Sequence, residues 1–466
     1  MENFWDFNVW GTFNLAAVLL FGLLVGHALK RTILLLRKSL IPTAVLGGCV
    51  LLLVSVAYRA ITGEEFFNVE FFGGKGSTNL EIITYHTLAL GFIASALRTS
   101  ERKMNKTRAT EVFNTGVTTV STYLLQGVLG LGITILAALV VESFFPAAGV
   151  LLPFGYGQGT GQAMNYGTIY ETDFGFVGGK SFGLTIAAMG FISASIGGVI
   201  HLYLLRRKGK LTAAVTEEDE IAPETIQDKD ELPMHSTMDK LTIQVALIAL
   251  AYFLAQVLMF ALGLLLPGMK SVIYGFNFLL GVMAATLVKV TLNFLQKKKI
   301  TRKKHTNNFL LTRASNFCFD LMVVAGIAVI RLDLVSRYWG ILLILGVVGL
   351  VSTYWYNYTV AKALFRNYQE EQFVAMYGML TGTASTGIML LRELDSQFKS
   401  PAADNLVYQN FPAIVFGFPM MLLAVLAPKK PLLTLGILAA FFLMMNLILF
   451  RGRIFRRRKV NAAVKK

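Results

Sequence analysis

Charged residues are scarce in this sequence. Asp, Glu, Lys and Arg together make up 15% of its 466 residues, whereas a soluble globular domain averages about 25%. Hydrophobic residues make up 55%, and they fall in blocks of about 20, the length of helix that crosses a bilayer. The composition therefore excludes an ordinary soluble domain and predicts an all-α polytopic membrane protein, with membrane lipid as a partner.

Several patterns that carry well-known chemistry are missing. The two cysteines, Cys49 and Cys318, lie inside apolar blocks, so no disulfide framework is predicted. The five histidines form no H-E-x-x-H pair, which excludes that metalloprotease ligand set. The run GGKSF (Gly178–Phe182) resembles the end of a phosphate-binding loop, but Phe174 stands where that loop requires glycine. We therefore expect neither an enzyme nor an ATP-driven pump, and no organic cofactor.

The net charge of +16 does not indicate a nucleic-acid partner, because the basic residues form short runs between apolar blocks. Examples are KKKITRKKH (Lys297–His305) and RGRIFRRRK (Arg451–Lys459), whereas GEEFFNVE (Gly63–Glu70) is acidic. Loops rich in Lys and Arg stay on the cytoplasmic side of a membrane. The pattern predicts a multi-pass protein of the cytoplasmic membrane with its N-terminus outside and its C-terminus in the cytoplasm.

About eleven transmembrane helices are expected. Their ranges are Thr12–Leu29, Ile41–Tyr58, Ile82–Leu97, Val112–Val141, Lys180–Leu205, Leu241–Leu266, Ser271–Leu292, Asn308–Ile330, Tyr338–Ala363, Val407–Leu426 and Leu432–Phe450.

An acidic segment near the middle of the sequence separates two similar halves. We interpret 206–240, which contains TEEDEIAPETIQDKDEL, as a cytoplasmic linker. A first five-helix repeat then covers 1–205 and a second covers 241–428, while 429–466 holds an extra span and a basic tail. An odd number of spans in each repeat requires the second copy to be inverted, which is typical of secondary transporters.

Each half also contains one segment rich in Gly, Thr and other polar residues. These are GYGQGTGQAMNYG (Gly155–Gly167) within 145–170 and MYGMLTGTASTGIML (Met376–Leu390) within 371–395. Non-helical backbone at membrane depth persists only inside protein or beside a wet cavity. We predict two re-entrant hairpins that enter from opposite sides and meet at their tips. The alternative is a seam of small residues where helices pack.

The hairpin tips and one carboxylate supply the predicted binding residues. Backbone N–H groups at helix N-termini bind anions, and hydroxyl or carboxylate oxygens bind cations. Asn165 has both a donor and an acceptor for an amino-acid end, and Thr160, Thr383 and Asp320 are the sodium-ligand candidates. The full set is Gly157, Gly159, Thr160, Gly161, Asn165, Thr381, Gly382, Thr383, Ser385, Thr386 and Asp320.

Asp320 falls near the middle of an expected span, where a carboxylate is costly and is usually functional. The alternative is a structural pair with Arg313, seven residues earlier on the same helix. His86 is expected to be a buried histidine with satisfied hydrogen bonds. Lys289 is close enough to a helix end for its amine to reach the interface.

Three stretches resemble the sodium/glutamate symporter family. IPTAVLGG (Ile41–Gly48) opens the second span, as a similar stretch does in that family. GQGTG (Gly157–Gly161) is similar to the family's first hairpin motif, with Gln158 in place of histidine, and TGTAST (Thr381–Thr386) is similar to the second, without its proline. The resemblance implies sodium-coupled uptake of glutamate by a homodimer.

Other functions remain open on the sequence alone. One is a symporter for another organic anion, including a proton-coupled one. A channel and a membrane scaffold are alternatives of a different class. A channel would conduct ions without substrate, and a scaffold would not need the polar hairpins.

Overall fold

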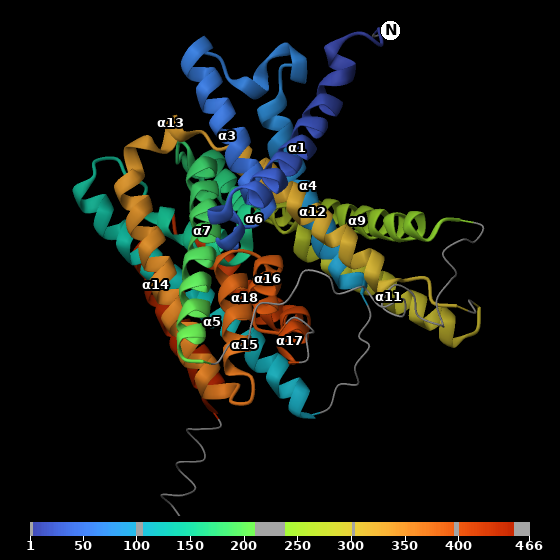
Figure 1. The fold of residues 1–466 in the computed structure, drawn as a ribbon, viewed down its shortest axis with the longest axis vertical. Helices are drawn as coiled ribbons and strands as arrows, with labels where there is room; N and C mark the ends of the chain where they lie inside the picture. The colour runs from blue at the N-terminus through green and yellow to red at the C-terminus, as the bar shows by residue number, and fades with distance from the viewer. Residues whose placement is uncertain (1–2, 99–105, 210–237, 301–302, 396–399, 452–466) are drawn as a thin grey trace, which may run out of the picture. The chain divides into compact units, whose positions relative to one another are not determined.

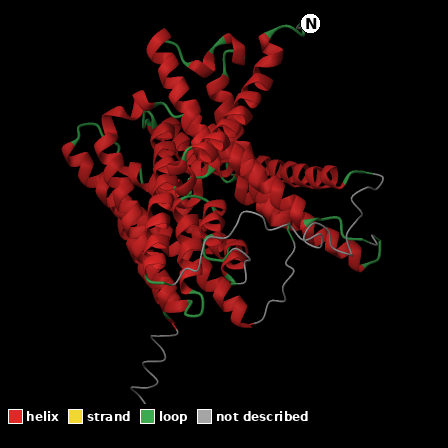
Figure 2. Ribbon diagram, in the orientation of Figure 1, coloured by secondary structure: helices red, strands yellow, loops and turns green. Residues whose placement is uncertain are grey.

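The structure, a computed structural model, describes residues 3–98, 106–209, 238–300, 303–395 and 400–451. This part of the chain is almost entirely helical and contains no β-strand (Figures 1 and 2). Ten of its helices are long and apolar enough to cross a membrane, and a bent pair of helices adds an eleventh. The prediction of an all-α polytopic protein with about eleven spans is confirmed. Most of the predicted linker at 206–240, and the tail beyond 451, lie outside the described residues.

Contacts divide the chain into two compact units, and each unit takes helices from both halves of the sequence. The first unit is drawn from Met1–Leu36, Pro42–Lys103 and Ala214–Ile330. The second is drawn from Arg37–Ile41, Met104–Ala213 and Arg331–Lys466. Neither unit coincides with one predicted repeat.

The first unit contains six long helices: α1 (Phe7–Thr32), α3 (Thr43–Thr62), α4 (Gly76–Leu97), α9 (Lys240–Leu265), α11 (Asn277–Lys297) and α12 (Asn308–Ala328). Their packing is reciprocal between the two halves of the sequence. Helix α4, from the first half, packs against α12, from the second. Helix α3 packs on α12, and its counterpart α11 packs on α4. In the same way, α1 packs on α3 and α9 packs on α11. Such reciprocal pairs are what a two-fold related repeat requires, so they support the inverted repeat, which stays a prediction.

Polar side chains fix several helix ends in the first unit. The carboxylate of Asp239 accepts from the backbone N–H of Leu241 at 2.9 Å and so caps the start of α9. The ammonium of Lys289 donates to the carbonyls of Ala96 at 2.6 Å and Arg98 at 3.1 Å. Lys289 therefore caps the C-terminal end of α4, where a positive charge also suits the helix dipole.

The second unit contains α5 (Lys106–Val140), α6 (Leu151–Phe174), α7 (Gly179–Arg207), α14 (Trp339–Leu364), α15 (Gln369–Thr381), α16 (Ala384–Arg392), α17 (Ala402–Tyr408), α18 (Asn410–Leu426) and α19 (Pro431–Leu449). Helices α5 and α14 pack against each other, and α18 packs on α5 as α7 packs on α14. Helix α19, the extra terminal span, packs along α5.

Two predicted spans are divided in the structure. Ser271–Leu292 is split between α10 (Lys270–Gly275) and α11, and the break follows Gly275, a residue that weakens helices. Val407–Leu426 is split between α17 and α18. Pro412 lies in the first turn of α18, where its missing N–H costs no helical hydrogen bond, so a new helix begins there readily.

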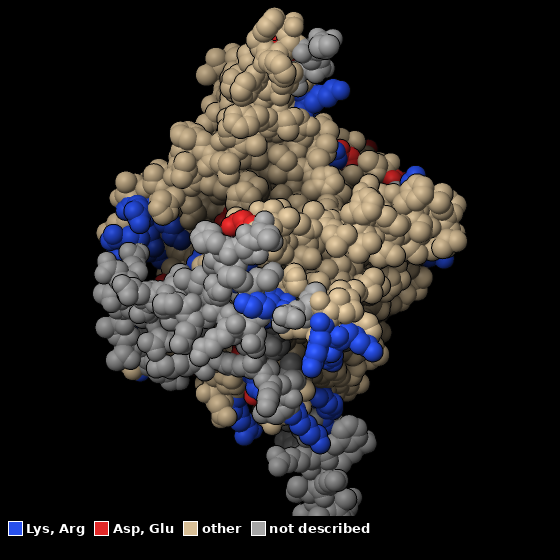
Figure 3. Space-filling model, turned by 90° about the vertical axis from the view of Figure 1, so that its right-hand side faces the viewer, with Lys and Arg blue, Asp and Glu red and all other residues tan. Residues whose placement is uncertain are grey.

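Outward faces of the long helices are apolar. Helix α9 exposes Val245, Phe253, Phe260 and Leu264. On the face shown in Figure 3, most described residues carry no charge, and the Lys and Arg side chains gather in patches. An apolar outward face along a long helix is typical of helices that are surrounded by lipid.

Candidate functional site

The first Gly-rich segment folds into a hairpin at Gly159. This residue has φ 80° and ψ −171° in the middle of α6, a conformation that is essentially restricted to glycine. The ring of Phe145 stacks on Phe176 at 4.7 Å, and the ring of Phe154 stacks on Tyr166 at 3.9 Å. A straight helix would separate Phe154 and Tyr166 by about 18 Å along its axis. The chain therefore reverses at Gly159, between an arm formed by η3 (Pro146–Val150) with the start of α6 and an arm formed by the rest of α6.

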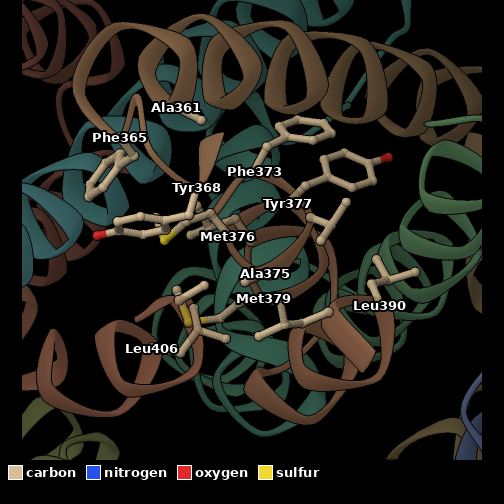
Figure 4. Packing of buried hydrophobic residues seen from close by; sticks show 14 residues of the cluster. Ala361, Phe365, Tyr368, Phe373, Ala375, Met376, Tyr377, Met379, Leu390 and Leu406 are labelled. Carbon is tan, nitrogen blue, oxygen red and sulfur yellow. The ribbon is translucent and has the colours of Figure 1, made fainter. Parts of the chain in front are cut away.

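The second segment forms a hairpin of two separate helices, α15 and α16. Gly382 (φ −146°, ψ −105°) and Thr383 (φ −140°, ψ 169°) leave the helical conformation between them. The arms are close: a Cβ added at Gly378 would lie 2.8 Å from the Cα of Gly387. Both arms contribute to an apolar core in which Phe373 and Tyr377 of α15 and Leu390 of α16 are fully buried (Figure 4). This core fixes the hairpin within the second unit.

Helix α5 binds both hairpin tips through two side chains. The hydroxyl of Tyr123 donates to the carbonyl of Gly157 at 3.0 Å. The Nε2 of Gln126 donates to the carbonyl of Leu380 at 3.0 Å. Residues three apart in a helix lie on neighbouring positions of one face. The two tips therefore lie against the same stretch of α5, although they are far apart in the sequence.

Helix α7 also contacts both hairpins, at Gly190. A Cβ added to Gly190 would lie 2.5 Å from the carbonyl oxygen of Thr381 and 3.2 Å from Cδ2 of Tyr156. The hydroxyls of Tyr156 and Tyr377 both reach Ser193, one at its Oγ (2.8 Å) and one at its carbonyl (2.7 Å). Only glycine at position 190 permits this approach, so α7 brings the start of α6 and the end of α15 together.

The predicted hairpin residues are placed together in the second unit, and most are buried. The buried ones are Gly157, Gly159, Thr160, Gly161, Asn165, Thr381, Gly382 and Thr386. Thr383 is half-buried, and its hydroxyl accepts from the N–H of Thr386 at 3.4 Å at the start of α16. The side chain of Ser385 lies outside the described residues.

Asp320 lies on α12 and belongs to the first unit, so the structure does not group it with the hairpin residues. Its side chain is exposed in the isolated chain. The alternative pair with Arg313 is not formed, because the Arg313 guanidinium lies over the ring of Phe309 at 5.0 Å. Among the described residues, Asp320 has no hydrogen-bond or ion-pair partner.

The expectation for His86 is wrong in one respect. Its Nδ1 is hydrogen-bonded to the Tyr252 hydroxyl at 2.6 Å, as expected of a satisfied histidine, but the residue is exposed rather than buried. The ring of Tyr252, on α9, lies 5.7 Å from the His86 ring.

Sequence reasoning missed a polar ladder between α5 and α14. Besides the Leu380 carbonyl, Gln126 Nε2 reaches Thr353 Oγ1 at 2.8 Å, and Asn357 Nδ2 reaches Thr122 Oγ1 at 3.3 Å and the Thr353 carbonyl at 2.9 Å. Because each amide nitrogen donates to a carbonyl, the side-chain orientations are determined. The oxygens, Gln126 Oε1 and Asn357 Oδ1, are buried and have no hydrogen-bond partner in the part of the chain that the structure describes. The presence of Gln126 and Asn357 within apolar spans was the sequence signal that could have revealed this ladder.

The groups near the hairpin tips that could coordinate a cation are uncharged. In the described part of the chain, no group of three or more His, Cys, Asp or Glu side chains is placed to hold a metal ion. The oxygens available beside the tips are amide, hydroxyl and backbone oxygens, which suit a hard monovalent cation better than a transition metal.

Comparison with known proteins assigns the chain to a family. No curated protein matches it in sequence. The profile of the sodium/glutamate symporter family matches residues 5–400, which include both hairpins and the polar ladder of α5 and α14. The chain therefore belongs to the sodium/glutamate symporter family, whose members are multi-pass membrane transporters rather than enzymes.

Proposed function

We propose that this protein is a sodium-coupled symporter that takes up glutamate, or a closely related anionic amino acid, across the cytoplasmic membrane. One observation carries the proposal: two broken helices, far apart in sequence, are both bound at their tips by Tyr123 and Gln126 of α5. Discontinuous helices of this kind hold substrate and coupling ion in secondary transporters.

The two breaks provide complementary groups for the two solutes. The arm after Gly159 and helix α16 each begin at a break, and the N–H groups there are donors for a carboxylate. The hydroxyls of Thr160 and Thr383 and the free amide oxygens of the polar ladder are acceptors for sodium. Sodium bound beside the tips would also offset the negative charge of the substrate.

The same proposal includes the inverted repeat, the re-entrant course of both hairpins, and a homodimer with its N-terminus outside. The reciprocal packing of α3 on α12 and α11 on α4 supports the repeat. The basic runs support the orientation.

An impermeant thiol reagent added to intact cells is expected to label a cysteine at Glu65 and not one at Lys298; the reverse pattern would overturn the orientation.

Uptake of radiolabelled glutamate into proteoliposomes tests the function. An inward sodium gradient is expected to drive accumulation, and dissipation of that gradient with a sodium ionophore is expected to abolish it. Accumulation that follows a proton gradient instead would favour the proton-coupled alternative. An ionic current without substrate would indicate a channel.

Asp320→Asn tests the carboxylate of the first unit in the same assay. We expect the variant to insert normally and to need a several-fold higher sodium concentration for half-maximal uptake, because an unpaired carboxylate within a span attracts the coupling ion. Asp404→Asn, at the start of α17, is the control and should leave the sodium response unchanged. An unchanged sodium response in Asp320→Asn would assign that residue no part in coupling.

A further inference from the structure

Gln162 is a fully buried polar side chain near the tip of the first hairpin. It lies three residues after the break at Gly159 and is 1% exposed. Neither its Nε2 nor its Oε1 has a hydrogen-bond partner among the described residues. Exchanging the two atoms would exchange two unpaired groups, so the observation does not depend on how the amide is oriented. Protein interiors rarely leave both ends of an amide unsatisfied.

The position of Gln162 follows from the helix period. Residues four apart share one helix face, so Gln162 lies on the same face as Tyr166. The ring of Tyr166 stacks on Phe154 of the other arm at 3.9 Å. Gln162 is therefore on the face of the second arm that is turned toward the first arm. It lies one helical turn nearer to the tip than Tyr166, and the tip contains Gly157 and Thr160.

The hairpins contain no positively charged group near their tips; the nearest in the second hairpin is Arg392, at the far end of α16. Pro146–Phe174 has no Lys, Arg or His, and Gln369–Leu391 has none either. The groups that the tips themselves offer to a carboxylate are therefore neutral donors. A ligand that satisfies Gln162 must also supply a hydrogen-bond donor to its Oε1, and a carboxylate group has no donor.

We propose that Gln162 binds the α-amino-acid head of the substrate. Its Nε2 donates to the α-carboxylate and its Oε1 accepts from the α-ammonium, so both buried atoms are satisfied by adjacent groups of one ligand. This inference rests on the proposed transport function and assigns recognition of the substrate's amino and carboxylate groups to one residue. Dicarboxylates that lack an amine leave Oε1 unpaired, at the cost of a buried unsatisfied acceptor.

The test compares L-glutamate with glutarate, which has the same two carboxylates and no amine. Binding to the purified full-length protein in sodium-containing detergent is measured by the ligand-induced rise in unfolding temperature. Wild type is expected to bind L-glutamate more tightly than glutarate. In Gln162→Met, which keeps the side-chain length, glutamate affinity is expected to fall by about ten- to a hundredfold and the preference for glutamate by about tenfold.

Gln244→Met is the matched control. Gln244 is also buried, but its amide bonds to the carbonyls of Lys240 and His305 and to the N–H of Asn307. Its loss should lower the unfolding temperature and leave the preference for glutamate intact. Gln162→Met should not lower the unfolding temperature without ligand, because no protein partner is lost.

Two outcomes would overturn the inference. One is a Gln162→Met variant with the wild-type preference for glutamate over glutarate, which would mean that bound water alone satisfies this amide. The other is equal binding of both ligands by wild type. Failure of the proposed function is distinct: sodium-driven uptake would be absent from proteoliposomes even if glutamate binding depended on Gln162.

Discussion

Gly159→Ala is expected to reduce sodium-driven glutamate uptake by about ten- to a hundredfold in a protein that still inserts. At φ 80° and ψ −171°, Gly159 has a conformation that costs a residue with a Cβ about 1–3 kcal/mol. Each 1.4 kcal/mol corresponds to a factor of ten. Relief of this strain must move the tip, and with it the Gly157 carbonyl that Tyr123 holds.

Gly132→Ala is the control for that substitution. Gly132 lies in α5, and a Cβ there meets no atom within 4 Å. Alanine at this helical position should leave uptake unchanged. Wild-type uptake and glutamate affinity in Gly159→Ala would show that transport does not depend on the shape of the first tip.

Replacing either tip threonine with valine is expected to weaken binding of glutamate or sodium. Valine keeps the shape of Thr160 or Thr383 and removes the hydroxyl. The loss of one hydrogen bond to a charged group is worth about 1.5–3 kcal/mol, so affinity should fall by about ten- to a hundredfold. Concentration dependence of uptake, measured separately for glutamate and sodium, identifies the affected solute.

Serine variants control for the threonine changes. Thr160→Ser and Thr383→Ser keep the hydroxyl and should retain most of the affinity. The comparison matters at position 383, because the Thr383 hydroxyl also accepts from the N–H of Thr386 and so stabilises the start of α16. Equal loss in the serine and valine variants would indicate a packing effect and would contradict a binding role.

Breaks in the two Gly-rich segments were predictable because glycine and polar residues are anomalous in an apolar chain, whereas the re-entrant course of these segments stays a prediction. The predicted segments, 145–170 and 371–395, correspond to Pro146–Phe174 and Gln369–Arg392 in the structure. The sequence did not identify the turn residue of the first hairpin among its five glycines; in the structure only Gly159 of that segment has positive φ. The existence of a break in each segment depends on residues that are adjacent in sequence.

The support of the hairpins was not predictable from the sequence. Tyr123 lies in a long apolar helix, where a tyrosine is most simply explained as part of the core. Its hydrogen bond to Gly157, and that of Gln126 to Leu380, exist only because tertiary packing brings α5 to both tips. His86 illustrates the same limit, because its exposure depends on how far α9 covers it.

A double-mutant cycle on Thr160 and Thr383 tests most directly whether the two hairpins form one binding site. Glutamate affinity in sodium-driven uptake is measured for wild type, Thr160→Val, Thr383→Val and the double variant. Residues that share a ligand are coupled by about 0.5–3 kcal/mol, whereas distant sites are additive. The account predicts that the loss in the double variant differs from the product of the single losses by at least about twofold. Simple multiplication of the two losses would contradict a shared site.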